Sequence, residues 1–241
     1  MIDLHCHLIP GIDDGPETLQ QALELANIAV ADGITHAVVT PHIHPGRWEN
    51  NHKIIKAKVD SFKRVLAHKD IPLKIGFAGE VRLSEQIITQ VDNHKIPFYG
   101  EYNGHQVMLL EFPHGHIIPG SEKLVGWLLA KGITPMIAHP ERNKEIMKNP
   151  KRLNVFVGAG CLVQVTAGSI TGGFGESAQG VALELLDQGH VSVIATDAHN
   201  AKARPPILSE AYKTVELVYG KAGAEQLFVD TPKQISANQF E

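Results

Sequence analysis

The sequence predicts an α/β protein, a (β/α)7-like barrel in which seven parallel strands alternate with helices. Seven short apolar runs of strand type recur along the chain, and segments with helical periodicity separate most of them. The runs are continuously apolar rather than half polar, which indicates strands buried on both faces. Closure of such a sheet into a barrel leaves no exposed edge strand.

The predicted strands follow from these apolar runs. In chain order they are residues 2–5 (IDLH), 34–40 (ITHAVVT), 74–80 (KIGFAGE), 107–112 (VMLLEF), 133–139 (ITPMIAH), 161–166 (CLVQVT) and 191–197 (VSVIATD). Asn103-Gly104 lies between strand-like residues in the segment 98–107, which favours a tight hairpin turn just before the fourth strand.

Helical spacing is clearest in two segments. Apolar residues recur at Leu19, Leu23, Ala26 and Val30, and a capping glycine, Gly33, follows them. A second series with the same spacing runs from 207 to 218 and precedes Gly220. The chain has no internal repeat or linker, so residues 1–241 are expected to form a single domain, with a polar and mobile tail at about 232–241.

Composition limits the classes of partner. The formal net charge is -4, so no basic face predicts a nucleic-acid partner or a membrane surface. No signal peptide opens the chain, and no run approaches the roughly 18 apolar residues of a membrane span. Cys6 and Cys161 are the only cysteines and form no CxxC unit, so both are expected to be buried thiols of a cytoplasmic protein without direct membrane insertion.

The histidines, 14 in all, are unusually numerous, and several lie at the ends of predicted strands. His5 and His7 have the spacing that places both side chains on the same face of a strand. Six of the seven strands end in a potential metal ligand, and Asp14 follows the first strand in a glycine-bounded loop. The nine candidates are His5, His7, Asp14, His42, Glu80, Glu111, His139, Asp197 and His199.

Six of the nine candidates also have an ordinary structural explanation. His5 and His7 could be solvated, Glu80 or Glu111 could pair with an arginine, His139 could be a core histidine, and Asp14 could cap a helix. However, the carboxyl ends of parallel strands meet on one face, where a cluster of carboxylates would repel itself without cations. The shared position of these residues therefore predicts a metal centre.

Charge counting bears on the number of ions. Asp14, Glu80, Glu111 and Asp197 carry four negative charges, so two divalent ions would neutralise them and three would leave about +2, which suits a phosphate dianion. Mixed imidazole and carboxylate ligands are typical of Zn, Mn or Fe. Arg142 and Arg204 follow the fifth and seventh strands, where a guanidinium fork could bind phosphate oxygens. Alternatively, both arginines could be solvated surface residues.

Several motifs together resemble the polymerase and histidinol phosphatase (PHP) superfamily and, within it, the capsule-associated protein-tyrosine phosphatases of bacteria. They are DLHCHLIPGIDDG at 3–15, TPH at 40–42, AGE at 78–80, LLEF at 109–112, AHPER at 138–142, and TDAHN through RPP at 196–206. HxH alone occurs in many metallohydrolases, whereas the combination of IDDG, HPER and DAHN followed by RPP is fairly specific to the tyrosine-phosphatase branch.

The resemblance implies a distorted (β/α)7 TIM-like barrel of the PHP type with three metal sites. One site would use His5, His7, Glu80 and Asp197, a second Glu80, Glu111 and His139, and a third Asp14, His42 and His199, with Glu80 bridging two ions. Manganese is the metal that the resemblance implies. The implied substrate is phosphotyrosine, carried on the C-terminal tail of a bacterial tyrosine kinase that controls capsular or exopolysaccharide synthesis.

The corresponding mechanism is attack on phosphorus by a metal-bridging water, with Arg142 and Arg204 binding the phosphoryl oxygens. No general acid is assigned. Neither cysteine is followed by an arginine six positions later, which excludes the loop of cysteine-dependent phosphatases, and no GxGxxG motif predicts a dinucleotide. His44 and His52 are expected to be bystanders, and the loop 170–177 (ITGGFGES) is expected not to contact substrate.

Two rival functions remain open at the level of sequence. A related phosphoesterase could use the same metal core on a small molecule such as histidinol phosphate, or on nucleic-acid ends. Alternatively, a non-catalytic barrel could hold the metals structurally and serve as a binding module. A closed structural site would need neither open coordination positions nor phosphate-binding arginines.

Overall fold

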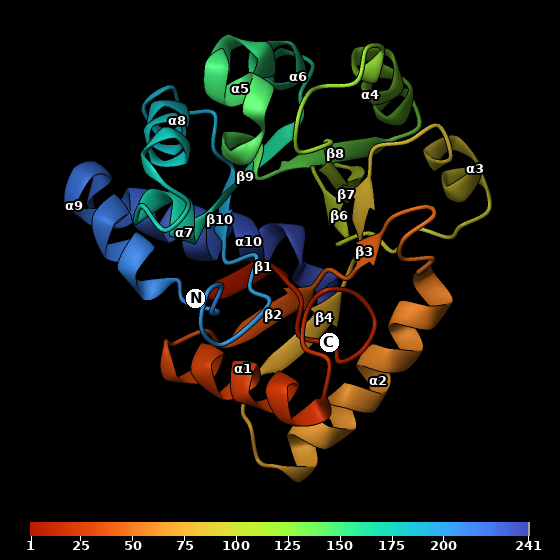
Figure 1. The fold of residues 1–241 in the computed structure, drawn as a ribbon, viewed down its shortest axis with the longest axis vertical. Coiled ribbons are helices and arrows are strands. Elements are labelled where there is room, and N and C mark those ends of the chain that lie inside the picture. Colours follow the sequence, from red (N-terminus) through yellow and green to blue (C-terminus); the bar gives the residue numbers. More distant parts are fainter. Residues whose placement is uncertain (241) are drawn as a thin grey trace.

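Parallel strands form the centre of the structure, a computed structural model that describes residues 1–240 (Figure 1). One sheet has the order β1 (Ile2–Cys6), β2 (His36–Val39) and β4 (Lys74–Phe77). The other runs from β10 (Val193–Ala195) through β9 (Leu162–Thr166), β8 (Ile133–Ala138), β7 (His105–Glu111) and β5 (Glu80–Arg82) to β3 (His42–Ile43). All neighbours on these two paths pair in parallel.

The two sheets are parts of one barrel. The second predicted strand, 34–40, is observed as β2, and β3 follows it after Pro41, which has no N–H to donate to a neighbouring strand. The third predicted strand, 74–80, is observed as β4, and β5 begins at its last residue, Glu80. At the other side, Asp197 N donates to His5 O at 2.7 Å, and His7 N donates to Ala198 O at 2.8 Å. The first and last strands therefore meet, and the predicted α/β barrel is confirmed.

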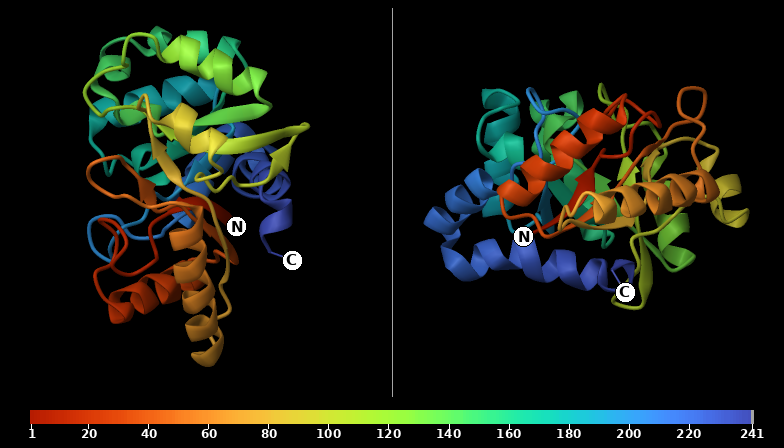
Figure 2. Two further views of the ribbon diagram at one scale, coloured as in Figure 1. Left: turned by 90° about the vertical axis from the view of Figure 1, so that its right-hand side faces the viewer. Right: turned by 90° about the horizontal axis from the view of Figure 1, so that it is seen from below.

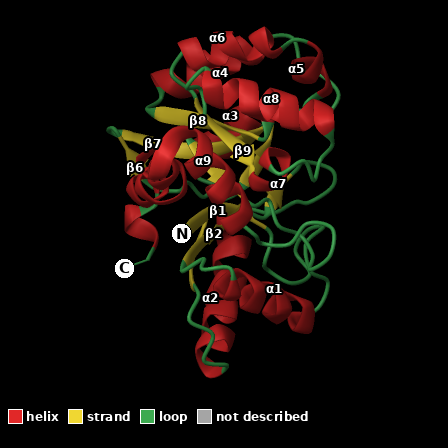
Figure 3. Ribbon diagram, turned by 90° about the vertical axis from the view of Figure 1, so that its left-hand side faces the viewer, coloured by secondary structure: helices red, strands yellow, loops and turns green. Residues whose placement is uncertain are grey.

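Helices surround the strands in Figures 1 and 3. They are α1 (Leu19–Ala31), α2 (His52–His68), α3 (Ile87–Asp92), α4 (Ser121–Ala130), α5 (Lys144–Lys148), α6 (Asn154–Gly158), α7 (Ala167–Ile170), α8 (Glu176–Asp187), α9 (Ser209–Glu225) and α10 (Thr231–Ile235). Shorter 3-10 or π turns span Pro140–Arg142, Pro150–Leu153, Gln226–Asp230 and Ala237–Gln239. None of the helices within residues 1–240 is long and apolar enough to cross a membrane.

Local sequence signals explain several boundaries. Thr18 and Gln21 form a capping box at the start of α1. Gly220, with φ of 74°, interrupts α9, but the chain returns to helix as far as Glu225, so the predicted helix end is a kink. Asn103 and Gly104 both have positive φ, as the tight turn between β6 (Glu101–Tyr102) and the antiparallel β7 requires, so the predicted hairpin is confirmed.

The core has an inner and an outer layer. Side chains such as Leu4, Val38, Leu109 and Met136 pack inside the barrel, together with the buried Tyr99. The alternate residues of the same strands, such as Val39 and Leu110, pack outward against the helices. This apolar interior fills one end of the barrel and leaves polar side chains at the opposite end.

The expected mobile tail at 232–241 is wrong for the residues that the structure describes. Figure 2 shows that the C-terminal helices lie against the barrel, and the side chain of Ile235 is fully buried inside it. Gln239 Oε1 accepts from Phe77 N at 2.8 Å, and its Nε2 donates to Tyr99 O at 2.6 Å. A Cβ at Gly76 would lie 2.6 Å from Gln239, so the absence of a side chain at Gly76 leaves the space that the Gln239 side chain occupies. Glu241 lies outside the described residues.

Candidate metal centre

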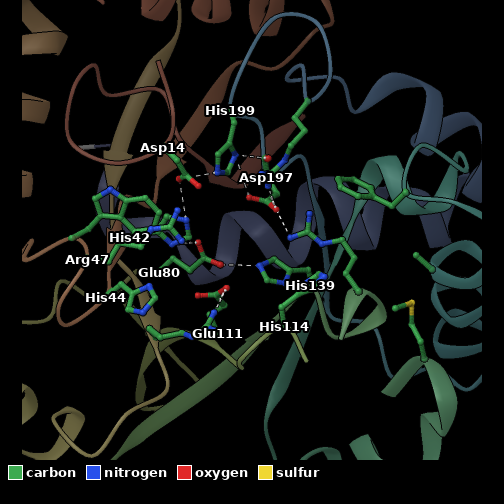
Figure 4. A pocket seen from close by; sticks show the side chains of 17 residues that line it. Asp14, His42, His44, Arg47, Glu80, Glu111, His114, His139, Asp197 and His199 are labelled. Atoms are coloured by element: carbon green, nitrogen blue, oxygen red, sulfur yellow. Dashed lines mark hydrogen bonds and ion pairs between the residues drawn. The ribbon is translucent and has the colours of Figure 1, made fainter. Parts of the chain in front are cut away.

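A cavity of about 490 Å³ opens at the carboxyl ends of the strands (Figure 4). The structure brings all nine predicted ligands together in one cluster, and all of them except His5 and His7 line this cavity. Their ligand atoms form four overlapping groups, and within each group these atoms all lie within 4.8 Å of one another. The groups are His7 with Asp14, His42 and His199; His5 with His7 and Glu80; His5 with His139 and Asp197; and His42 with Glu80 and Glu111. These four groups do not coincide with the three ligand sets that the resemblance implies, so the partition into three sites stays a prediction.

His5 and His7 are buried at the base of the cluster because of a register shift in β1. The pairing of β1 with β2 is irregular between Asp3 and Cys6. Leu4 packs inside the barrel and Cys6 packs outward, so the irregularity lets His5 and His7 turn inward directly after an inward Leu4. Bulges commonly re-aim side chains beside active sites in this way.

Strained backbone turns two other predicted ligands toward the cavity. His139, at the end of β8, has φ of 32°, and Asp197, two residues after β10, has φ of 51°. Non-glycine residues rarely adopt positive φ, and such strain concentrates at functional sites. Both side chains point into the group shown in Figure 4.

Glu80 lies at the centre of the cluster and is fully buried. Its Oε1 lies 2.8 Å from His139 Nε2, and its Oε2 lies 2.9 Å from His42 Nδ1. His5 Nε2 and His7 Nε2 each lie 3.4 Å from the same Oε2. Among residues 1–240, neither Glu80 Oε2 nor His42 Nδ1 has a partner with hydrogen-bond geometry. A carboxylate oxygen faced by three imidazole nitrogens without hydrogen bonds fits a bound cation.

Asp14 forms the outer part of the cluster, with a half-exposed side chain. Its Oδ1 lies 3.2 Å from His42 Nε2 and 3.3 Å from His199 Nε2. The indole of Trp48 stacks on His42, with ring centroids 4.7 Å apart, and so restrains this imidazole. Because Asp14 remains accessible at the cavity wall, an ion here would retain a side open to substrate.

Opposite charges maintain ionised groups despite burial. Burial alone would raise the pKa of Glu80, but nearby His42 and His5 hold it well below its usual value. Burial alone would lower the pKa of His42, but Glu80 and Asp14 raise it to about 10. Burial, together with the charge of Arg142, instead lowers the pKa of His139 to about 3. Without metal, the cluster therefore combines protonated and neutral imidazoles.

Arg142 and Arg204 both reach the cavity, where both donate to Asp197 Oδ2, Arg142 at 2.5 Å. The Nε atoms of both arginines lack a hydrogen-bond partner within the described part of the chain. Burial lowers the pKa of Arg142, but the charge of Asp197 outweighs this effect and raises it. These positions fit the predicted phosphate role better than the alternative of a solvated surface.

A third arginine, Arg82, was missed from the sequence. Its Nη1 donates to Glu111 Oε1 at 2.7 Å inside the cavity, so the alternative in which a predicted carboxylate ligand pairs with an arginine is also realised. Arg82 follows Glu80 by two residues on β5, and this shared strand face could have indicated its position.

Two expectations about loop residues stay predictions, although the residues concerned lie beside the cavity. Phe174, in the glycine-rich loop 170–177, lines the cavity, and the Cζ of Arg142 lies 4.6 Å from its ring centroid. The loop therefore borders the space available to substrate. His44, expected to be a bystander, also lines the cavity, whereas His52 begins α2 and contacts Phe77.

Both cysteines are buried thiols, as expected. Burial raises the pKa of Cys161 to about 12 and raises that of Cys6 well above its usual value. A thiol with a raised pKa is a poor nucleophile at neutral pH, so neither cysteine suits a covalent phosphatase mechanism.

Comparison with known proteins supports one family. Residues 1–237 match the family described as capsular polysaccharide synthesis, CpsB/CapC. The chain is 34% identical over 220 residues to the tyrosine-protein phosphatase YwqE of Bacillus subtilis, covering 91% of this chain and 85% of YwqE. It is 29% identical to the tyrosine-protein phosphatase CpsB of Streptococcus agalactiae serotype III, with full coverage of both chains.

The solved structures agree. A structure from work on YwqE of Bacillus subtilis and CpsB of Streptococcus pneumoniae, described as metal-dependent tyrosine phosphatases, matches with a TM-score of 0.92 and 33% identity, covering 99% of this chain and 95% of that chain. An organophosphorus hydrolase from Deinococcus radiodurans shares only the fold, with a TM-score of 0.60 and 13% identity over 97% of this chain and 92% of that chain. These matches confirm the resemblance predicted from the motifs. The chain belongs to the CpsB/CapC family of capsular polysaccharide synthesis proteins.

Proposed function

We propose that this protein is a metal-dependent protein-tyrosine phosphatase. The observation that carries the proposal is the gathering of all nine predicted metal ligands in one cluster, of which seven line the same cavity as the two predicted phosphate-binding arginines. The relatives with the same full-length architecture are tyrosine phosphatases by name, and the matching structure is described as metal-dependent.

The cluster would hold two or three divalent ions. The group of Asp14, His42 and His199 would hold one ion, and the groups that share Glu80 would hold the others. Oxygen and imidazole ligands suit manganese, with iron or zinc as alternatives. Since Arg82, Arg142 and Arg204 add three positive charges to the cavity, two ions already leave the four predicted carboxylate ligands more than neutralised.

Bound divalent ions would lower the pKa of a water molecule so that hydroxide is available near neutral pH. The protein's own contribution is to bind and orient the phosphoryl group. Arg142 and Arg204 carry unpartnered Nε–H groups, within residues 1–240, that can donate to phosphoryl oxygens as negative charge spreads over them. A tyrosine leaving group, with a pKa of about 10, needs less protonation than an alkoxide.

The substrate would be a phosphotyrosine protein, in particular the C-terminal tail of a bacterial tyrosine kinase that regulates capsular or exopolysaccharide synthesis. The family description and the relatives' names support this assignment. The cavity opens on the face of the barrel formed by the βα loops, where a flexible protein segment can reach it.

Two assays separate this function from its rivals. Protein stripped by a chelator and reloaded with Mn²⁺, Fe²⁺ or Zn²⁺ is assayed on a phosphotyrosyl peptide and on histidinol phosphate. We expect faster hydrolysis of the peptide, and equal or faster hydrolysis of histidinol phosphate would contradict the substrate assignment. Arg204→Ala should retain its metal and lose most of its turnover. A wild-type protein that binds metal but hydrolyses neither substrate would indicate a binding module.

A further inference from the structure

The same hydrogen-bond arrangement occurs twice behind the metal cluster. In each case, one acceptor oxygen binds the Nδ1 of a buried histidine and also the backbone N–H of a different predicted ligand. The two acceptors are Gln164 and Asp13, neither of which is among the nine predicted ligands.

Gln164 is fully buried on β9. Its Oε1 lies 2.9 Å from His5 Nδ1 and accepts from His139 N at 3.2 Å. Because a backbone N–H can only donate, this atom of Gln164 must be the carbonyl oxygen rather than the amide nitrogen. His5 Nδ1 must therefore carry a proton, and His5 Nε2 is the nitrogen left to bind a metal.

Asp13 makes the corresponding contacts with His7 and with the backbone of His42. Its Oδ2 lies 2.7 Å from His7 Nδ1 and accepts from His42 N at 3.1 Å, while its Oδ1 accepts from Gly15 N at 3.0 Å. A Cβ at Gly15 would lie 2.8 Å from His7 O, so only glycine allows the loop to pack this closely. The hydrogen bond from Gly15 N thus fixes the Asp13 carboxylate in the orientation in which it contacts His7.

Both hydrogen bonds aim the Nε2 atoms at one point. His5 Nε2 and His7 Nε2 lie 3.4 Å apart. They lie 3.2 and 3.5 Å, respectively, from Asp197 Oδ1. Two nitrogen lone pairs directed at the same carboxylate are repulsive unless a cation or proton lies among them.

The geometry points to Gln164 and Asp13 as positioning residues of the metal centre, each holding one histidine in the Nδ1–H form and tying it to a second ligand. Gln164 couples His5 to His139, and Asp13 couples His7 to His42. The inference rests on the metal binding of the proposed function but not on its substrate. Asp13 is a carboxylate and Gln164 an amide, so the Nε2 of His7 should be a stronger metal ligand than the Nε2 of His5.

Metal affinity provides the first test, by calorimetric titration of chelator-stripped protein with Zn²⁺. Loss of such an outer hydrogen bond typically weakens metal binding about 10- to 100-fold, so we expect this loss in Gln164→Leu and Asp13→Ala. Gln164→Glu and Asp13→Asn keep an acceptor oxygen and should retain most of the wild-type metal affinity. Asp32→Asn is the matched control, because Asp32 accepts from Leu208 N and Ser209 N far from the cluster. It should lower the melting temperature without changing metal affinity.

Long-range ¹H–¹⁵N correlation spectra of zinc-loaded, ¹⁵N-histidine-labelled protein provide the second test. The wild type should show slowly exchanging Nδ1–H protons on His5 and His7. Gln164→Leu should lose this protection at His5 only, and Asp13→Ala at His7 only. Wild-type affinity and protection in both variants, or equal loss in Gln164→Leu and Gln164→Glu, would overturn the inference. Neither readout involves turnover. Failure of this inference can therefore be distinguished from failure of the proposed phosphatase function.

Discussion

Replacing Glu80 with glutamine tests the centre of the cluster with minimal change of shape. The Glu80 carboxylate is fully buried, 2.8 Å from His139 Nε2 and 2.9 Å from His42 Nδ1, with His5 and His7 at 3.4 Å. Removing one partner of a buried ion pair costs about 3–5 kcal/mol. At about 2–4 °C per kcal/mol for a chain of this size, metal-free Glu80→Gln should melt at least about 6 °C below the wild type.

The metal-loaded variant should be affected more strongly. A neutral amide cannot bridge two cations, so we expect loss of at least one bound ion and a fall in kcat of about 10²- to 10³-fold. Melting curves, elemental analysis and phosphotyrosyl-peptide hydrolysis measure the three effects. Glu141→Gln is the control, because this equally buried carboxylate bonds Thr166 N and Ser169 Oγ instead of the ligands. Full metal content and near wild-type turnover in Glu80→Gln would refute the central role of this residue.

Four further perturbations have defined outcomes. Arg204→Ala should lower kcat/KM on a phosphotyrosyl peptide by about 10- to 150-fold, since hydrogen bonds to charged groups contribute about 1.5–3 kcal/mol, and an unchanged kcat/KM would contradict phosphate binding. Phe174→Ala removes the contact with Arg142 and should raise KM by about two- to fivefold with little change in kcat, as steady-state kinetics can show. The raised pKa of His42, about 10, means that metal must displace a proton at neutral pH. Metal affinity should therefore rise by up to about tenfold per pH unit between pH 7 and 9, with proton release in calorimetry, and a pH-independent affinity would contradict this. Gln239→Ala should lower the free energy of unfolding by about 1–3 kcal/mol in denaturant titrations while turnover is retained.

Much of the barrel could be predicted because its strands are apolar and its ligands lie at strand ends. The inward and outward alternation of residues such as Leu109 and Leu110 gives continuous apolar runs, which are typical of a sheet covered on both faces. The ligand side chains gather at one end because parallel strands bring residues distant in sequence to the same face. For that reason His5 and Asp197 could be connected without any contact information.

Other features depended on contacts that no sequence pattern encodes. Gln164 occupies an ordinary inward strand position, and only the approach of His5 and the His139 backbone makes it functional. The expected mobile tail was wrong because its polar composition concealed Ile235 and the hydrogen bonds of Gln239. Phe174 was discounted as part of a flexible loop, although this aromatic residue lies on Arg142.

The most direct test of metal-dependent phosphatase activity is a titration of chelator-stripped protein with Mn²⁺ while hydrolysis of a phosphotyrosyl peptide is followed. The nine converging side chains predict no turnover without metal and a rise to a plateau at two or three equivalents. Turnover that survives complete removal of metal, or a plateau at one equivalent, would contradict the proposed multinuclear centre.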